Sequence, residues 1–290
     1  MPTLGKRQLM NNIFYIDGEF LPEKNAKIPV NDMAVLRGYG IFDFFRTYGG
    51  KPFHLKDHLK RLEHSARSIE LRLPLSIEKI HDIVMETLKK NQHKDSNVRI
   101  VVTGGQTEDF ITPCGKPRLL VMVTEVCTYP EKWYLDGVKI ITVPLERQIP
   151  AAKSLNYLSA ILALKDAYEK KAVEAVYTDR DGNLREGTTS NFFLFNQGKM
   201  ITPGTKDILP GITRQVVLEL AKHEFEVQIR EIHMDELSKA QGAFLSSSNK
   251  QILPVVQVDD LIIGDGKPCP QTRIIMKRFA DYTKRYAEEN

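Results

Sequence analysis

The sequence predicts a mixed α/β (α+β) protein of two domains. Short apolar runs that alternate with polar residues indicate strands, and longer segments with apolar residues three and four positions apart indicate helices. A length of 290 residues is near the upper limit for a single core. The stretch VCTYPEKWYLDG separates two strand-like segments, so we expect a smaller N-terminal domain over residues 1–128 and a larger C-terminal domain over residues 129–290.

In the first half, strands precede helices. IFYIDGEFLP places Asp17-Gly18 between two apolar runs, which is typical of a tight hairpin. Leu55, Leu59, Leu62 and Ala66 then mark one face of an amphipathic helix. The other expected elements are a strand pair at 41–48 and 52–55, a helix at 75–88, and strands at 98–103 and 118–124.

In the second half, strands and helices alternate more regularly. Apolar runs broken by a turn at Asp181-Gly182 and by helical periodicity indicate this order. The expected elements are strands at 138–143, 174–178 and 191–195, helices at about 156–171 and 213–223, short strands near 227, 244 and 255, and a closing helix.

Composition excludes several classes of protein. A total of 41 Lys and Arg against 37 Asp and Glu leaves a net charge of +4, too small to favour nucleic acid or an anionic membrane as the main partner. Three scattered cysteines do not form a disulfide framework and fit a reducing compartment. No segment approaches the roughly 18 unbroken apolar residues of a membrane span, and residues 1–12 lack the apolar stretch of a secretory signal. We therefore expect a cytoplasmic protein.

Several common site motifs are missing. The histidines and cysteines lack metal-ligand spacing, so no metal is expected. There is no nucleophile elbow and no phosphate-binding P-loop. Asp43 stands where a dinucleotide fingerprint beginning at Gly38 needs its third glycine.

Two stretches contain a candidate reactive charge. In AAKSLNYLSA, Lys153 lies among small and apolar neighbours, which lower the pKa of an amine that acts as a nucleophile. The alternative is a solvated loop lysine. In NLREGTTSNFFLF, Glu186 precedes an apolar strand, where a carboxylate is costly without a partner. The alternative is a turn acid that faces water.

Two further stretches are candidate anion sites. In ILPGITRQVVLELA, Gly211-Ile212-Thr213 opens a helix whose free N–H groups attract anions, although Thr213 as a simple N-cap is the alternative. In AFLSSSNKQILPV, the hydroxyl-rich turn is either a phosphate site or a hairpin loop.

Taken together, these stretches resemble the class IV aminotransferases, fold-type IV enzymes that use pyridoxal 5′-phosphate. The motifs are KSLNY, REGTTSN and LPGITR, with DHLKRLEHSA upstream, and the resemblance extends from about Phe14 to Phe279. This family includes branched-chain and D-amino-acid transaminases and aminodeoxychorismate lyase.

The resemblance implies roles for residues around the cofactor ring. Lys153 matches the lysine that joins the cofactor aldehyde and moves a proton between the substrate α-carbon and C4′, so it is the catalytic residue, in the C-terminal domain. Glu186 matches the partner of the pyridine nitrogen, and Leu209 matches the residue packed on the ring. Tyr157 matches a tyrosine near the ring hydroxyl, with a core tyrosine as the alternative.

The resemblance also implies a set of phosphate ligands. Arg61 matches the arginine that binds the cofactor phosphate, with a helix-surface arginine as the alternative. Ile212 and Thr213 match the ligands at a helix start, and Ser248 matches a second hydroxyl ligand.

The substrate motifs depart from the usual pattern. The arginine of V-T-R-G is missing, since the chain has Val102-Thr103-Gly104-Gly105. The segment RGYGIFD resembles a less usual branch of D-amino-acid transaminases in which two arginines bind the carboxylate. The residues expected at the substrate are Arg37, Phe42, Phe44, Arg46 and Arg99, with Arg37 reaching from a second subunit and each arginine alternatively forming a surface salt bridge.

The expected activity is therefore transamination between small amino acids and 2-oxo acids, of the D-amino-acid or the branched-chain type, in a homodimer. A lyase resembling aminodeoxychorismate lyase and a catalytically silent binding protein are the alternatives. The missing V-T-R-G arginine argues against the lyase, and the presence of both Lys153 and Glu186 argues against the silent protein.

Overall fold

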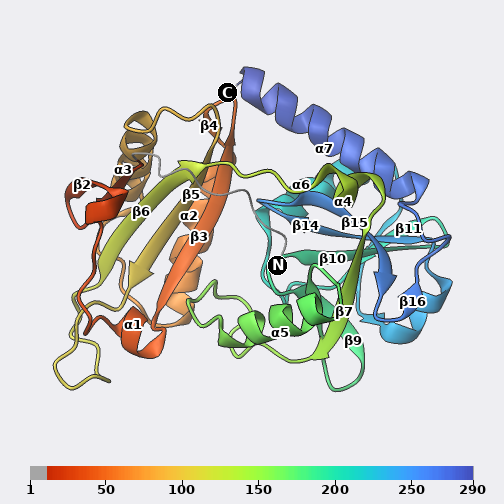
Figure 1. The fold of residues 1–290 in the computed structure, drawn as a ribbon, viewed down its shortest axis with the longest axis horizontal. Coiled ribbons are helices and arrows are strands. Elements are labelled where there is room, and N and C mark those ends of the chain that lie inside the picture. The colour runs from red at the N-terminus through yellow and green to blue at the C-terminus, as the bar shows by residue number, and fades with distance from the viewer. Residues whose placement is uncertain (1–11, 290) are drawn as a thin grey trace. The chain divides into compact units, whose positions relative to one another are not determined.

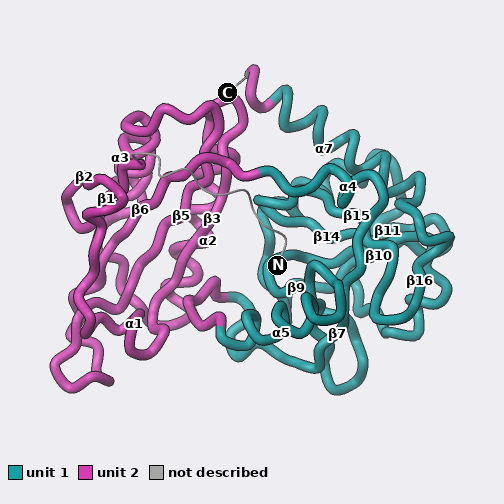
Figure 2. Tube along the Cα trace, in the orientation of Figure 1, with its two compact units in different colours: residues 1, 128–151, 158–285 teal, residues 2–127, 152–157, 286–290 magenta. Residues whose placement is uncertain are grey.

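The computed structural model describes residues 12–289, and its chain divides into two compact units (Figure 2). Unit 1 contains Thr128–Ala151 and Leu158–Arg285. The described residues of unit 2 fall within 2–127, 152–157 and 286–290. Residues 1–11, which carry most of the segment tested for a secretory signal, lie outside the described part.

Unit 2 is built on a six-stranded antiparallel sheet in the order β2-β1-β6-β5-β3-β4 (Figure 1). Asp17 and Gly18, both with positive φ, form the turn between the first two strands. The strands are β1 (Ile13–Ile16), β2 (Glu19–Pro22), β3 (Gly40–Tyr48), β4 (Lys51–Pro52), β5 (Ser96–Thr103) and β6 (Arg118–Glu125).

Two helices cover one face of this sheet, and a short one precedes β3. α2 (Leu55–Ser68) and α3 (Ile77–Lys89) bury their apolar stripes against alternate residues of the central strands, among them Phe45, Ile100 and Val121. α1 (Met33–Arg37) and the 3-10 turn η1 (Glu23–Asn25) complete the unit. Since side chains alternate along a strand, the odd-numbered residues of β3 face the helices and the even-numbered ones face away.

Residues 152–157 join unit 2 because they pair with the start of β3. The N–H of Phe42 donates to the carbonyl of Lys153 at 2.9 Å, and the N–H of Leu155 donates to the carbonyl of Gly40 at 2.9 Å. A Cβ on Gly40 would lie 2.7 Å from the carbonyl oxygen of Val102 on the paired strand, so this close approach requires glycine. Lys153 thus belongs to the compact unit of the N-terminal residues, although a division of the sequence at 128/129 places it with the C-terminal ones.

Unit 1 contains a ten-stranded sheet, most of which follows the order β12-β11-β10-β14-β15-β7-β8-β9-β13. One further pair, Asn191 opposite Glu186, connects β10 to β9 and closes six strands into a ring. The strands are β7 (Val138–Pro144), β8 (Ala175–Thr178), β9 (Asn183–Gly187), β10 (Asn191–Asn196), β11 (Lys199–Thr202), β12 (Val227–Ile229), β13 (Ile232–His233), β14 (Gly242–Ser247), β15 (Gln251–Val258) and β16 (Leu261–Ile262).

Helices complete unit 1, and α7 continues from it into unit 2. Ala163 and Ala167 of α5 pack on Ile141 and Tyr177 of the sheet. The helices are α4 (Glu131–Leu135), α5 (Leu158–Glu169), α6 (Ile212–Ala221), the 3-10 segment η2 (Met234–Lys239) and α7 (Pro270–Glu289). Within residues 12–289, no helix combines the length and apolar character needed to cross a membrane.

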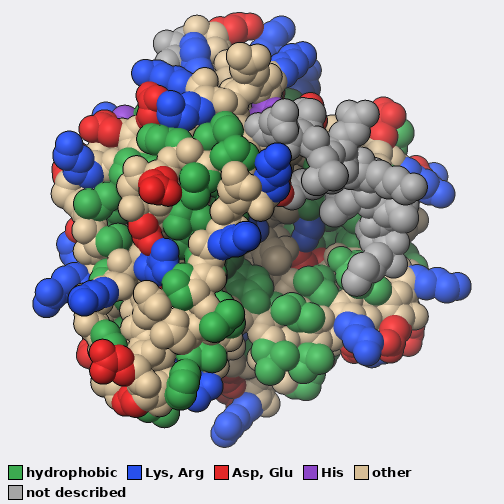
Figure 3. Space-filling model, turned by 60° about the vertical axis from the view of Figure 1, so that its left-hand side comes forward, with side chains coloured by type: hydrophobic (Ala, Val, Ile, Leu, Met, Phe, Trp, Pro, Cys, Tyr) green, Lys and Arg blue, Asp and Glu red, His purple; other side chains and the backbone are tan. Residues whose placement is uncertain are grey.

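The expected mixed α/β class is confirmed, as are the hairpin at Asp17-Gly18 and the main helices at 55–68, 77–89, 158–169 and 212–221. The expected strand at 52–55 is shorter, because α2 already begins at Leu55. The sequence patterns missed the short elements, which have too few residues to show a period: α1, α4, β9, β11, β13 and β16. Lys and Arg side chains are scattered over the face drawn in Figure 3, as expected from the small net charge.

Candidate functional site

In unit 2, the main chain of Lys153 is held from two sides. Its N–H donates to Ser65 Oγ of α2 at 3.0 Å, and its carbonyl accepts from Phe42 of β3. Lys153 is half-buried, and its Nζ lies 4.6 Å from the centre of the Phe42 ring. A cation over an aromatic face is stabilised electrostatically. The lysine is therefore a positioned side chain rather than a fully solvated one.

The Phe42 ring connects Lys153 to two other residues expected at the site. Tyr157 meets it edge-on at 5.4 Å between ring centres, and Arg99 Cζ lies 4.8 Å from its centre. Arg99, which pairs with Phe44 across β5 and β3, also lies 5.3 Å from the Phe44 ring. Unit 2 thus brings Lys153, Tyr157, Arg99, Phe42 and Phe44 together on the sheet face opposite the helices.

The other two expected substrate arginines lie apart from this group. Arg46 stacks on Tyr48 at 4.7 Å, farther along β3, and its Nε donates to the carbonyl of Thr47. Arg37 is exposed at the end of α1, and its Nη1 donates to the carbonyl of Leu36 at 2.8 Å. Gly38, with φ +65°, ends that helix.

Arg61 is buried on the helix side of the same sheet. Its Nε and Nη2 donate to the two carboxylate oxygens of Asp43 at 2.9 and 2.8 Å. His58 Nδ1 lies 2.7 Å from Asp43 Oδ1, while His58 Nε2 has no partner among the described residues. A surface position for Arg61 is therefore wrong, since only 8% of this residue is exposed.

Burial and charge act in opposite directions on this cluster. Burial raises the pKa of Asp43, but Arg61 and His58 lower it more, and the net pKa lies well below its ordinary value. Burial lowers the pKa of His58 more than Asp43 raises it. His58 is consequently neutral near pH 7 and donates its Nδ1 proton to a charged Asp43.

In unit 1, Glu186 is a buried carboxylate with two partners. Oε1 accepts from Arg147 Nη1 at 2.8 Å, and Oε2 accepts from the Leu209 N–H at 3.0 Å. Only 4% of Glu186 is exposed, so a turn acid that faces water is excluded. A cavity of about 270 Å³ adjoins it, with Arg147, Tyr177 and Arg185 among its lining residues.

The start of α6 lies next to Glu186 in the hydrogen-bond network. Asn191 Nδ2 donates to the carbonyl of Leu209 at 2.9 Å, which fixes the segment that leads into the helix. Gly211 is the N-cap, and no side chain caps the helix, so the N-cap alternative for Thr213 is wrong. A Cβ on residue 211 would lie 2.0 Å from Asn191 Oδ1, so this position requires glycine. Ile212 and Thr213 therefore begin a helix whose first N–H groups are available to an anion.

Arg214 adds a buried cation near these groups. Its Nη2 donates to the carbonyl of Pro203 at 2.7 Å, and its Nε has no partner among the described residues. Burial lowers the pKa of Arg214 to about 10, and Glu186 opposes that shift. Arg214 stays charged at neutral pH and contributes positive potential at the start of α6.

Ser248 lies in the turn that joins the antiparallel strands β14 and β15, so the expected hairpin loop is present in this stretch. The turn is held by its own hydrogen bonds. Ser247 Oγ donates to Asn249 Oδ1 at 2.9 Å, and Asn249 Nδ2 donates to Tyr129 OH at 2.7 Å. Ser248 itself is half-buried, and its role as a phosphate ligand stays a prediction.

The sequence patterns missed several charged residues of these networks. Asp43 interrupts the apolar strand IFDFF, and Glu174, which accepts from Lys250 Nζ at 2.7 Å, interrupts the apolar run AVEAV just before β8. A charge inside such a run is a readable signal of a buried partner. Arg147 and Lys250 lie in polar loops and show no such signal. Among residues 12–289, no group of three or more His, Cys, Asp or Glu is placed to hold a metal ion.

Comparisons with known proteins agree in sequence and in structure. The family model "Amino-transferase class IV" matches residues 40–258. A Methanocaldococcus jannaschii protein named "Putative branched-chain-amino-acid aminotransferase" is 36% identical over 92% of this chain and 95% of its own. D-alanine aminotransferase of Staphylococcus aureus is 32% identical over 96% of this chain and 100% of its own.

Solved structures show the same fold over most of their length. Branched-chain aminotransferase of Escherichia coli superposes with a TM-score of 0.88 at 25% identity, covering 94% of each chain. The branched-chain enzyme of T.th., solved with pyridoxamine 5′-phosphate, superposes with a TM-score of 0.89 at 27% identity, covering 96% of each chain. The family match spans well over half of the chain and agrees with both kinds of relative, so this chain belongs to the class IV aminotransferase family and has its fold-type IV architecture.

Proposed function

We propose that this aminotransferase binds pyridoxal 5′-phosphate through Lys153 and takes D-amino acids as amino donors, with Arg99 as the main cation for the substrate carboxylate. The enzyme class and its cofactor follow from the family. The individual residue roles and the choice of substrate are the proposal. The observation that carries it is the group formed by Lys153, Phe42 and Arg99 on one face of unit 2.

The residues present suit the cofactor chemically. The uncapped start of α6 offers backbone N–H groups to a phosphate, and Gly211 keeps that approach free of a side chain. Glu186 supplies a buried carboxylate for a protonated ring nitrogen, while Arg61 and the Ser248 hydroxyl are the other proposed phosphate ligands. Bound pyridoxal phosphate supplies an electron-accepting ring that stabilises negative charge at the substrate α-carbon.

Each side chain then has one task. Lys153 would hold the cofactor and, when released from it, would move a proton at the substrate α-carbon. Glu186 would keep the ring nitrogen protonated, and Arg147 fixes the direction of that carboxylate. Leu209 would pack on the ring, and Tyr157 would be the residue nearest its hydroxyl.

Arg99 favours the carboxylate of a substrate at this place over an aliphatic substrate side chain. Its guanidinium lies over the Phe42 and Phe44 rings, which hold its planar group in one orientation. The two rings also limit the size of the substrate. Arg37 and Arg46 are secondary candidates for the carboxylates of substrates.

A branched-chain L-amino acid is the second candidate donor, because one relative and several solved structures are named branched-chain aminotransferases. Half-reactions with D-alanine, D-glutamate, L-leucine and L-glutamate distinguish the two. The D-series proposal predicts conversion of both D-amino acids at a rate at least tenfold above L-leucine. Faster conversion of L-leucine would contradict it.

Three variants test the residue roles. Lys153→Ala abolishes the visible absorption band of the purified protein. Arg99→Ala lowers kcat/KM about 100-fold, because a charge-assisted hydrogen bond to a carboxylate is worth about 2–3 kcal/mol. Wild-type kcat/KM in both Arg99→Ala and Arg37→Ala would show that neither arginine binds the carboxylate.

A homodimer is part of the proposal. Leu158, Ile161 and Leu162 of α5 are each more than half exposed and lie on one side of the helix, an apolar patch suited to a second copy. We expect the wild type to sediment as a dimer and the variant Ile161→Lys to sediment as a monomer. A fully active wild-type monomer would contradict both the dimer and a role for Arg37 across subunits.

The three unpaired cysteines support a cytoplasmic location.

A further inference from the structure

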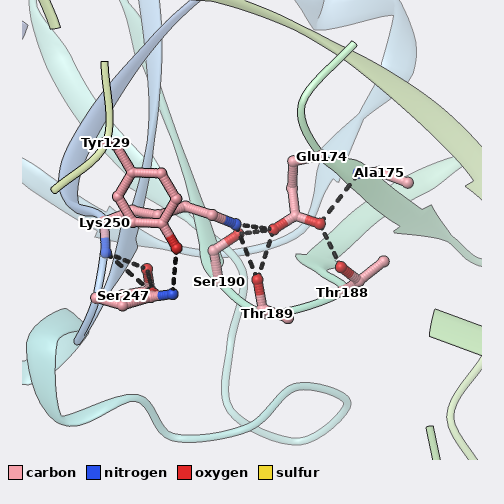
Figure 4. Close-up of polar contacts among 9 residues, drawn as sticks. Tyr129, Glu174, Ala175, Thr188, Thr189, Ser190, Ser247 and Lys250 are labelled. Atoms are coloured by element: carbon pink, nitrogen blue, oxygen red, sulfur yellow. Dashed lines mark hydrogen bonds and ion pairs between the residues drawn. The ribbon is translucent and has the colours of Figure 1, made fainter. Parts of the chain in front are cut away.

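A second buried ion pair lies in unit 1, and no step assigned above uses it. Glu174, directly before β8, is fully buried, and Lys250, directly before β15, is 7% exposed. Lys250 Nζ donates to Glu174 Oε2 at 2.7 Å (Figure 4). Burial raises the pKa of Glu174, but Lys250 and the neighbouring hydroxyls lower it more, so the carboxylate is charged.

The carboxylate of Glu174 binds every hydroxyl of the turn between β9 and β10. This turn, called the hydroxyl turn below, consists of Gly187, Thr188, Thr189 and Ser190. Oε1 accepts from Thr188 Oγ1, while Oε2 accepts from Thr189 Oγ1 at 2.8 Å and from Ser190 Oγ at 3.3 Å. Lys250 Nζ also donates to Thr189 Oγ1 at 2.9 Å, so both ions of the pair bind the turn.

The hydroxyl turn is tight because of this arrangement. The N–H of Gly187 donates to the carbonyl of Ser190 at 2.7 Å, and the N–H of Thr188 donates to the carbonyl of Ala175 at 2.9 Å. A Cβ on residue 187 would lie 2.3 Å from Ser190 Oγ, so a side chain there would displace the hydroxyl that binds Glu174. The three hydroxyls converge on one carboxylate and fix the path of the chain.

Glu186 and Asn191 flank the hydroxyl turn and pair with one another across β9 and β10. Both bind the same residue of the next segment: Glu186 Oε2 accepts from the N–H of Leu209, and Asn191 Nδ2 donates to its carbonyl. The direction of the Glu186 carboxylate and the start of α6 therefore depend on the shape of the turn.

Stability alone does not account for a buried ion pair at this place. Replacing both members of such a pair by uncharged residues is often neutral for folding, because the desolvation of two charges offsets their attraction. We propose that Glu174 and Lys250 are positioning residues that set the hydroxyl turn and thereby hold Glu186 against the cofactor ring nitrogen. This inference rests on the proposed role of Glu186.

The test compares the wild type with the double variant Glu174→Gln/Lys250→Met, which removes both charges and keeps similar volumes. We expect a thermal midpoint within a few degrees of the wild type, kcat lower about tenfold, and KM changed less than about threefold. The apoprotein is expected to bind pyridoxal phosphate more weakly. The pH midpoint of the visible absorption band is expected to shift in the same direction as in Glu186→Gln, which a purely structural role would not produce.

Two further variants make the result decisive. Thr189→Val keeps the ion pair but removes the hydroxyl that both ions bind. The changes in kcat, cofactor affinity and band midpoint are therefore expected at about one third of their size in the double variant. This variant keeps the test valid if the double variant does not fold. Arg278→Met/Glu224→Gln removes an ion pair that does not contact the hydroxyl turn and is expected to change neither kcat nor the band.

Wild-type kcat and a wild-type band midpoint in the folded double variant, or in Thr189→Val, would overturn the positioning role. If Glu186→Gln itself leaves the band and kcat unchanged, the proposed role of Glu186 fails instead. The two failures are therefore distinguishable.

Discussion

Asp43 in unit 2 and Glu174 in unit 1 are both buried carboxylates within apolar runs of the sequence, yet their contacts with the surrounding residues differ. Asp43 accepts from the side chains of Arg61 and His58 and from its neighbouring N–H, and Arg61 is itself a proposed phosphate ligand. Glu174 accepts from Lys250 and three hydroxyls, and the proposed cofactor residue is Glu186, on the adjoining strand. The first carboxylate contacts a proposed cofactor ligand directly, whereas the second contacts the turn that adjoins one.

We expect the Asp43 cluster to depend strongly on its carboxylate. Asp43→Asn removes the charged partner that Arg61 binds through two hydrogen bonds, and breaking a buried pair in this way costs about 3–5 kcal/mol of unfolding free energy. Urea unfolding measures the loss. The control is Asp57→Asn on the same helix as Arg61, where 42% of the side chain is exposed and the expected cost is below about 1 kcal/mol. Equal losses in the two variants would contradict the comparison.

A second variant tests whether Arg61 contributes to cofactor affinity. Arg61→Lys keeps the charge but cannot reproduce two parallel bonds to Asp43, since an ammonium lacks the planar fork of a guanidinium. We expect the dissociation constant of pyridoxal phosphate to rise about tenfold to 100-fold, as measured by titration of the apoprotein.

Arg67→Lys is the matched control for that substitution. It lies on the same helix with 74% of its side chain exposed, and cofactor affinity is expected to stay at the wild-type value. An unchanged affinity in Arg61→Lys would remove Arg61 from the phosphate site.

These two clusters also show what the sequence revealed and what it did not. The elements that carry them are confirmed, because α2 repeats its apolar residues over several turns and β3 is a long apolar run. Lys153, Glu186 and Arg61 are predicted site residues because of motifs, each a short string of neighbouring residues. The ion pairs of the two clusters are not predictable in this way, because Asp43 is 18 positions from Arg61, and Glu174 is 76 positions from Lys250. Contacts of that separation follow from strand order and register, which no local pattern specifies.

The smallest predicted effect is a difference between the two clusters in how the free energy of unfolding depends on pH. It depends on His58, since no histidine among the described residues binds Glu174. The folded-state pKa of His58 lies below its ordinary value of about 6.5, so as pH falls below that value the unfolded chain takes up a proton that the folded chain does not. Stability is therefore fully present above about pH 6.5 and declines below it, by up to about 1.4 kcal/mol per pH unit from this one group. The lowered carboxyl pKa values of Asp43 and Glu174 act in the same direction, but only below about pH 4, where unfolded carboxylates begin to protonate.

His58→Asn keeps an N–H for Asp43 and removes the titrating ring. It therefore isolates the pH dependence that arises from His58, which begins below about pH 6.5. Urea unfolding at half-unit steps between pH 4.5 and 7.5 is expected to show a shallower slope in this variant than in the wild type, with the two curves parallel above pH 6.5. His64→Asn, an exposed position on the same helix, is expected to keep the wild-type slope. Because Glu174 has no histidine partner among the described residues, Glu174→Gln/Lys250→Met is also expected to keep it. A wild-type slope in His58→Asn would mean that the buried imidazole takes up its proton as readily in the folded chain as in the unfolded one.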